Sequence, residues 1–303
     1  MLKINKPSLF APALLGALVT LTGCQPIQAP AASTTASSAT DEAVEIRFAL
    51  KAGDQDLSCA EPATGLGTTQ STVQLNDLRF YISNLALIDG GGNAVPVTLD
   101  QDGLWQVEST ALLDFEDGSV GCTETGNPDL NTSVRGTVAP GDYTAVRFDL
   151  GVPFALNHQD VTVAASPLNV PPMWWNWQGG YKFVRIDMKS DAAMMDGAWF
   201  IHLGSTGCVA ADQSKAPAEP CSRPNIATIQ LDGFDPAANT IVADLATLLA
   251  DVNLSESVPQ PPGCMSGPDD PDCAGLLPGF GLDIATGACA EAGCPDQAFF
   301  RVE

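Results

Sequence analysis

Apolar and polar residues alternate with a period of two in several short stretches of the chain, a pattern typical of half-buried β-strands. Turn-rich segments separate these stretches, for example residues 89–93 and 139–142. Only residues 242–252 show convincing helical spacing. The pattern predicts an all-β fold, an antiparallel β-sandwich with long loops and one short helix, forming a single domain over residues 44–303. The predicted strands are 44–50, 78–88, 143–150, 181–188, 198–203, 226–231 and 299–302.

Composition agrees with this fold class and excludes one class of partner. The 303 residues include 28 Gly and 23 Pro, and only 16% are charged, which fits many strands and turns better than helical bundles or coiled coils. The chain has 13 Lys and Arg against 36 Asp and Glu, a net charge of −23. Because this charge repels phosphate backbones, nucleic acid is not an expected partner.

The N-terminus reads as an export signal that ends at a lipid site. Residues 1–23 combine two early lysines with an apolar run over 9–21 that is too short to span a bilayer. They lead into Leu21-Thr22-Gly23-Cys24, which resembles a bacterial lipobox, so Cys24 is expected to carry lipid. Cleavage removes the two lysines and changes the charge to −23 − 2 = −25. Residues 24–43 are rich in Pro, Ala, Ser and Thr and are expected to form a disordered tether.

No second apolar run approaches the length of a membrane span, so the lipid is the only expected anchor. Gln25 stands where an aspartate is associated with retention at the inner membrane, which favours the outer membrane, with the protein facing the periplasm.

The other eight cysteines favour disulfides, because the chain is expected to be exported and no Cys-x-x-Cys spacing supports a thiolate zinc site. Eight cysteines allow 105 connectivities. Proximity along the chain favours Cys208–Cys221, Cys264–Cys273 and Cys289–Cys294, and Cys59–Cys122 follows by elimination.

The chain has only two histidines, His158 and His202, which limits its chemistry. A three-histidine site and a His-Glu-x-x-His motif are both impossible, and Ser205 lacks the first glycine of a nucleophile elbow. A single histidine is more often a structural residue than a ligand. The pair binds one metal ion only if the fold brings the two side chains together.

Three of the five tryptophans, Trp174, Trp175 and Trp177, lie within four residues. In an extended segment, Trp175 and Trp177 point to one face and Trp174 to the other. Core packing at a sheet edge, a stacking platform for sugar rings, and redox-active or metal-adjacent indoles all fit this cluster.

Several short strings together resemble the MbnP-type proteins. These are the periplasmic copper-binding proteins of methanobactin operons, also called the four-Cys members of the metallo-mystery pair. The resemblance extends over essentially all of residues 44–303, and the strings occur in the family's order. They include Gly151-Val152-Pro153-Phe154, Leu156-Asn157-His158, Ser166-Pro167-Leu168-Asn169, Trp175-Asn176-Trp177-Gln178, Gly180-Tyr181-Lys182-Phe183, the run from His202 to Cys208, Gly263-Cys264-Met265-Ser266-Gly267 and the terminal Phe299 to Glu303.

The resemblance implies a β-rich copper-binding protein and a partner. That partner is a di-haem enzyme of the MbnH type, related to MauG and bacterial cytochrome c peroxidases, which oxidises a tryptophan to kynurenine. Carried onto this chain, His158 and His202 become copper ligands, and Trp175 or Trp177 becomes the kynurenine that completes the site. Two imidazoles and a weak third ligand suit Cu(I). Cys289 and Cys294 lie outside the family's four-Cys motif.

The sequence therefore predicts a lipid-anchored copper-binding protein with a role in copper homeostasis or uptake, itself a substrate and not an enzyme. Two alternatives stay open. One is a surface carbohydrate-binding module with a platform made of Trp174, Trp175 and Trp177. The other is an enzyme that uses a tryptophan-derived cofactor, although only the two histidines offer it an acid or base.

Overall fold

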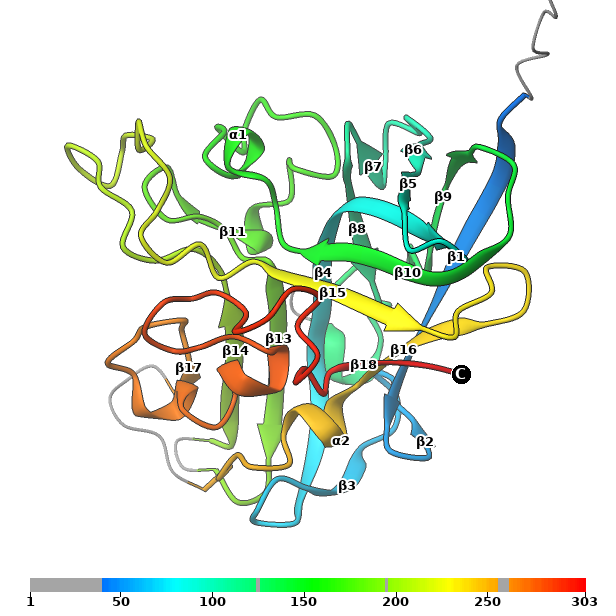
Figure 1. Cartoon of the computed structure of the whole chain (residues 1–303). Coiled ribbons are helices and arrows are strands. Elements are labelled where there is room, and N and C mark those ends of the chain that lie inside the picture. The colour runs from blue at the N-terminus through cyan, green and yellow to red at the C-terminus, as the bar shows by residue number, and fades with distance from the viewer. Residues whose placement is uncertain (1–39, 124–125, 194–195, 256–261) are drawn as a thin grey trace, which may run out of the picture. The chain divides into compact units, whose positions relative to one another are not determined.

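The long strand β4 (Ser71–Asp89) is the centre of the larger of the two main sheets (Figure 1). The computed structural model describes residues 40–123, 126–193, 196–255 and 262–303. In this part of the chain the larger sheet has ten strands, and its main path runs β15-β10-β4-β13-β14-β17. Besides β4, the strands of this path are β15 (Ala227–Asp232), β10 (Tyr143–Leu150), β13 (Val184–Ser190), β14 (Ala198–Leu203) and β17 (Gly263–Cys264). Three further strands pair with β4, namely β3 (Ala63–Leu66), β5 (Ala94–Pro96) and β8 (Thr110–Asp114). The last strand, β7 (Gln106–Val107), pairs with β8.

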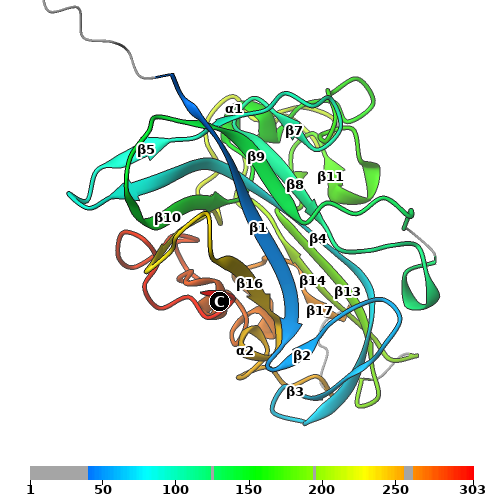
Figure 2. The ribbon, with the colours of Figure 1, turned by 90° about the vertical axis from the view of Figure 1, so that its right-hand side faces the viewer.

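The smaller sheet is built around β1 (Glu42–Ala52), which crosses over the larger sheet in the view of Figure 2. Two strand pairs are parallel, β1 with β16 and β14 with β17, so both sheets are mixed. A third, two-stranded sheet pairs β11 (Trp174–Asn176) with β12 (Gly180–Tyr181). The other strands of the smaller sheet are β18 (Phe300–Val302), β16 (Thr240–Asp244), β9 (Ser133–Val138), β6 (Thr98–Leu99) and β2 (Gln55–Asp56).

Aromatic side chains from both sheets form the core between them. Phe48 of β1 meets Phe80 of β4 at 6.0 Å between ring centroids and Phe148 of β10 at 5.9 Å. Phe300 of β18 lies 5.2 Å from Phe148. The period-two pattern explains this geometry, because alternate residues of β1 such as Ile46, Phe48 and Leu50 are the buried ones. The expected all-β sandwich is confirmed.

The helical prediction over 242–252 is correct only in part. Residues up to Asp244 belong to β16, which pairs in parallel with β1 from Arg47 to Lys51. Helix α2 (Leu245–Leu248) begins only after Asp244, whose side chain caps it by accepting hydrogen bonds from the backbone N–H groups of Ala246 and Thr247. A second short helix, α1 (Phe154–Asn157), was not expected. Four 3-10 helices complete the described helices: Val120–Cys122, Pro171–Met173, Pro271–Cys273 and Leu277–Phe280.

All four expected disulfides are present, Cys59–Cys122, Cys208–Cys221, Cys264–Cys273 and Cys289–Cys294. Proximity along the chain therefore predicted three of the pairs correctly, and elimination predicted Cys59–Cys122. The expected signal peptide, Cys24 and most of the tether lie outside the described residues. Among the residues that are described, none of the helices is both long enough and apolar enough to cross a bilayer.

Candidate metal site

His158 follows directly after helix α1, and only 8% of its surface is exposed. Its Nδ1 lies 3.0 Å from the backbone carbonyl oxygen of Trp177. A carbonyl oxygen only accepts hydrogen bonds, so Nδ1 must be the protonated nitrogen. Nε2 then has the free lone pair, which agrees with the side-chain amide of Asn157, a donor, 3.3 Å away. His158 therefore offers Nε2 to a metal ion.

His202 lies on β14 opposite Arg185 of β13, and its side chain is mostly buried. Its Nε2 is 2.7 Å from Oδ1 of Asp187. Burial raises the pKa of the Asp187 carboxyl, but hydrogen bonds and charge from His202 and Arg185 outweigh it and bring this pKa to about 2. The ionised carboxylate accepts the Nε2 proton, which leaves Nδ1 as the free nitrogen. A carboxylate behind a ligating imidazole is a common arrangement in metal sites.

Both imidazoles favour the neutral form, which is the form that ligates. Burial lowers the pKa of His158, and the hydrogen bond with the Trp177 carbonyl opposes this only in part. Burial also lowers the pKa of His202, although Asp187 opposes it. Neither ring therefore needs to lose a proton to bind a metal at neutral pH.

The tryptophan cluster forms the hairpin of β11 and β12, and its geometry differs from the sequence expectation. Trp174 and Trp177 do not face opposite ways, because their rings meet edge to face with centroids 4.9 Å apart and an interplanar angle of 85°. The reason is that β11 ends at Asn176, whose side chain accepts a hydrogen bond from the N–H of Gly179 at 2.8 Å and closes a turn that contains Trp177. Trp174, Trp175 and Trp177 are all half-buried.

The ring of Trp175 packs over Gly204, two residues after His202. A Cβ atom at position 204 would lie 2.5 Å from Cζ3 of Trp175 and 2.7 Å from the carbonyl oxygen of Tyr181, so only glycine fits there. Strand β14 ends at Leu203, so this contact reaches the chain directly after the strand that bears His202. The ring of Trp175 thus contacts the chain two residues from His202, while the backbone carbonyl of Trp177 accepts the hydrogen bond of His158.

Asn157 joins three of the motif strings. Its Oδ1 accepts the N–H of Tyr181 at 2.8 Å, and its Nδ2 lies 3.3 Å from Oγ of Ser205. Gly180 has φ of +76°, and a Cβ there would lie 2.5 Å from the Asn157 carbonyl oxygen, which explains the glycine before Tyr181. The strings that contain His158, Tyr181 and His202 therefore meet through one amide side chain.

The string from Gly263 to Gly267 contacts the backbone of His202. Oγ of Ser266 donates to the carbonyl oxygen of His202 at 2.7 Å and accepts the N–H of Gly204 at 2.9 Å. Sequence reasoning did not single out Asp187, Asn157 or Ser266. The sequence could have indicated Asp187, because Arg185 and Asp187 are charged residues that alternate with apolar residues in a strand where both faces are buried.

Contacts with the hairpin or its neighbouring residues involve the segments of both histidines. Among the described residues, however, no group of three His, Cys, Asp or Glu residues with ligand atoms within 4.8 Å of one another contains both His158 and His202. The set that contains His158 is completed by Cys208 and Cys221. Convergence of His158 and His202 on one ion stays a prediction.

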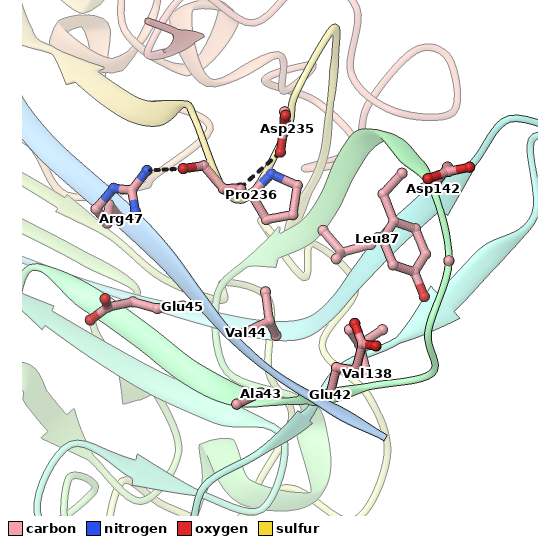
Figure 3. Close-up of a pocket in the computed structure, with 13 residues that line it drawn as sticks. Glu42, Ala43, Val44, Glu45, Arg47, Leu87, Val138, Asp142, Asp235 and Pro236 are labelled. Atoms are coloured by element: carbon pink, nitrogen blue, oxygen red, sulfur yellow. Dashed lines mark hydrogen bonds between the residues drawn. The ribbon is translucent and has the colours of Figure 1, made fainter. Parts of the chain in front are cut away.

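A pocket of about 420 Å³ lies away from both histidines, beside β1 (Figure 3). Val44, Leu87 and Val138 line it together with carboxylates such as Glu42 and Asp235, and Arg47 donates to the carbonyl oxygens of Ala237 and Asn239 at its edge. Neither a histidine nor a tryptophan lines this pocket, so it is separate from the two histidines and from the tryptophan hairpin.

Fold and site together define a disulfide-linked β-sandwich with a tryptophan hairpin and two mostly buried histidines that favour the neutral form. The chain belongs to the MbnP family, because the family model matches residues 41–266. A solved structure of MbnP from Methylosinus trichosporium is similar to it, with a TM-score of 0.77 and 30% identity, over 87% of this chain and 98% of that one. A search of the curated proteins finds no match. The expected family is confirmed.

Proposed function

We propose that this protein binds copper, as Cu(I), through His158 and His202 beside the tryptophan hairpin. Trp175 or Trp177 is oxidised to kynurenine by a partner di-haem enzyme of the MauG type. Cys24 holds the protein by a lipid at the outer membrane, facing the periplasm. Its role is in copper uptake or homeostasis, and it acts as a binding protein and not as a catalyst.

The hydrogen-bond partners of the two imidazoles are the observation that supports this proposal best. Each ring has one nitrogen beside a protein acceptor, at 3.0 Å for His158 and 2.7 Å for His202, which leaves the other nitrogen without a proton. Neutral imidazole is a strong ligand for copper by the Irving–Williams order. The donor set therefore fits copper without any change in protonation.

The hairpin supports the proposed modification. The ring of Trp175 lies at Gly204 near His202, and the backbone of Trp177 is bonded to His158. Oxidation of an indole to kynurenine creates an aniline nitrogen, which an unmodified side chain cannot supply. By contrast, the rings of Trp174 and Trp177 meet at 85° and do not form one flat platform for a sugar ring.

Copper titration of histidine variants tests the ligand assignment. We expect the protein to bind one copper ion, and His158→Ala or His202→Gln to abolish tight binding. Glutamine keeps a donor for Asp187, so this variant separates ligation from packing. Asp212→Asn, which removes an exposed carboxylate, is the control and should bind normally. Unaltered stoichiometry in both histidine variants, measured on protein with native circular dichroism, would refute the assignment.

Peptide mass spectrometry tests the modification. Protein made with the di-haem partner should contain kynurenine in the peptide that spans residues 173–182, and protein made without it should not. Peptides with Trp105 or the fully buried Trp199 should stay unmodified in both samples. If all five tryptophans remain intact after exposure to the oxidised partner, this half of the proposal is wrong.

A further inference from the structure

His158 faces a disulfide as well as the tryptophan hairpin. Its Nε2, the nitrogen without a proton, lies 3.7 Å from Sγ of Cys221. The ligand atoms of His158, Cys208 and Cys221 all lie within 4.8 Å of one another. In the oxidised protein the two sulfurs are bonded to each other and are poor ligands. Reduction would turn the same three residues into two thiols and one imidazole.

Exposure distinguishes this disulfide from two of the others. The cysteines of Cys59–Cys122 and Cys264–Cys273 are all at most 1% exposed. Cys208 is half-buried, and the residue after it, Val209, is 82% exposed. Cys289–Cys294 also has one half-buried cysteine, but it belongs to no such three-residue set in the described part of the chain. Cys208–Cys221 is the disulfide that combines access with an imidazole.

We propose that Cys208 and Cys221, when reduced, form a redox-gated Cu(I) site with Nε2 of His158. A dithiol reductant supplies two electrons and two protons, the S–S bond breaks to give two cysteine thiols, and the reductant itself becomes a disulfide. Cu(I) then displaces the thiol protons and binds two thiolates and one imidazole. Thiolates are soft ligands that select Cu(I), and His158 is already deprotonated at Nε2.

The inference deepens the proposed function by adding a redox-dependent second position for the metal. It shares His158 with the proposed copper site but needs neither His202 nor kynurenine. The two proposals can therefore fail separately. Reduction would transfer copper from the hairpin to the thiolates, so the redox state of one disulfide would regulate how firmly the protein holds the ion.

Cu(I) binding in competition with bicinchoninate, on a His202→Gln background, tests the proposal. The oxidised variant should not hold Cu(I) against the chelator. After reduction and removal of the reductant it should hold one Cu(I), with sulfur and imidazole scatterers in its X-ray absorption spectrum. The same reduced background with Cys208→Ser and Cys221→Ser should hold none, whereas Cys289→Ser and Cys294→Ser should leave binding unchanged. Adding His158→Ala should remove the imidazole scatterer.

Three results would overturn the proposal. One is equal Cu(I) retention by the reduced Cys208→Ser/Cys221→Ser variant. A second is thiol alkylation and mass mapping that find Cys208–Cys221 intact while a buried disulfide is reduced. The third is loss of the native circular dichroism on reduction, because the three ligands meet only in the folded protein.

Discussion

At the scale of single residues, the two histidines present opposite nitrogens. His158 donates from Nδ1 to a backbone carbonyl and has no proton on Nε2, whereas His202 donates from Nε2 to Asp187 and has no proton on Nδ1. The acceptor beside His158 is a backbone carbonyl, so no side-chain mutation removes it. The acceptor beside His202 is the side chain of Asp187. Mutation of Asp187 can therefore test whether this hydrogen bond orients His202.

Asp187→Asn should weaken copper binding by about 10–100-fold, the usual loss when the acceptor behind a ligating histidine is changed. The amide can turn its NH₂ group toward Nε2, which would favour protonation of Nδ1 and block the ligating nitrogen. Long-range ¹H–¹⁵N spectra of the metal-free protein report which nitrogen has the proton. They should show Nε2–H for His202 in the unmodified protein and a mixed or inverted tautomer in the variant.

Asp77→Asn is the matched control for this test. Asp77 is fully buried and pairs with the guanidinium groups of Arg79 and Arg185, so its loss disturbs the same cluster of charges. It should lower stability but leave the tautomer of His202 unchanged. If both variants change the histidine spectrum alike, Asp187 acts through the general packing of the cluster and not as a positioning residue.

At the scale of elements, the hairpin of β11 and β12 depends on its surroundings, because strands of three and two residues have little stability alone. Two buried tyrosines fix the loop that precedes it. The hydroxyl of Tyr81 donates to the carbonyl oxygen of Pro167 at 2.9 Å, and that of Tyr181 donates to Leu168 at 2.6 Å. The Ser-Pro-Leu-Asn string therefore supplies backbone acceptors that help to position the tryptophans.

The sequence predicted strands well where one face of the sheet is buried. It predicted them poorly where contacts with distant strands determine the secondary structure. The stretches 143–150 and 198–203 coincide with β10 and β14, because alternation is a direct record of one buried face. Residues 242–244 have helical spacing but form part of β16, because parallel pairing with β1 outweighs a local pattern. The two parallel pairs join strands far apart in the sequence, which periodicity cannot reveal.

The candidate site could be predicted only in part for similar reasons. Scarcity alone singled out His158 and His202, and crowding singled out the tryptophans. The contacts that set their chemistry come from distant segments, such as Ser266 at the backbone of His202. The faces of the tryptophans were mispredicted because a turn begins at Trp177, where an extended segment had been assumed.

At the scale of the whole molecule, the acidic balance of the chain extends into its interior. In one cluster four buried carboxyls, those of Asp77, Asp114, Glu116 and Asp187, outnumber the cations, which are the guanidinium groups of Arg79 and Arg185 and the ammonium group of Lys182. Charge neutrality therefore favours protonation of some of these acids. Burial raises the pKa of Asp114 to about 7, although Arg79 opposes it, and burial also raises the pKa of Glu116.

This arrangement predicts a pH dependence of stability with a definite sign. An acid whose pKa is about 7 when folded and 3.8 when unfolded binds more protons in the folded state between these values. Its stabilising contribution is complete below the unfolded pKa and is lost as the pH rises toward 7. The free energy of unfolding of the metal-free protein should therefore fall by up to about 1.4 kcal/mol per pH unit across this window from Asp114 alone.

Urea unfolding at a series of pH values, followed by circular dichroism, measures this slope. Asp114→Asn should reduce the fall between pH 4 and 7. Glu116, whose pKa shifts in the same direction, adds a slope of the same sign, whereas the two histidines, whose pKa values burial lowers, add a slope of the opposite sign. Asp117→Asn is the matched control, because hydrogen bonds from Ser119 lower the pKa of Asp117 and its contribution is lost only as the pH falls below the unfolded value. A slope between pH 4 and 7 that is the same in Asp114→Asn as in the unmodified protein would show that Asp114 is ionised in the folded state. Arg79 would then outweigh burial, and the excess of carboxyls would have to be neutralised elsewhere.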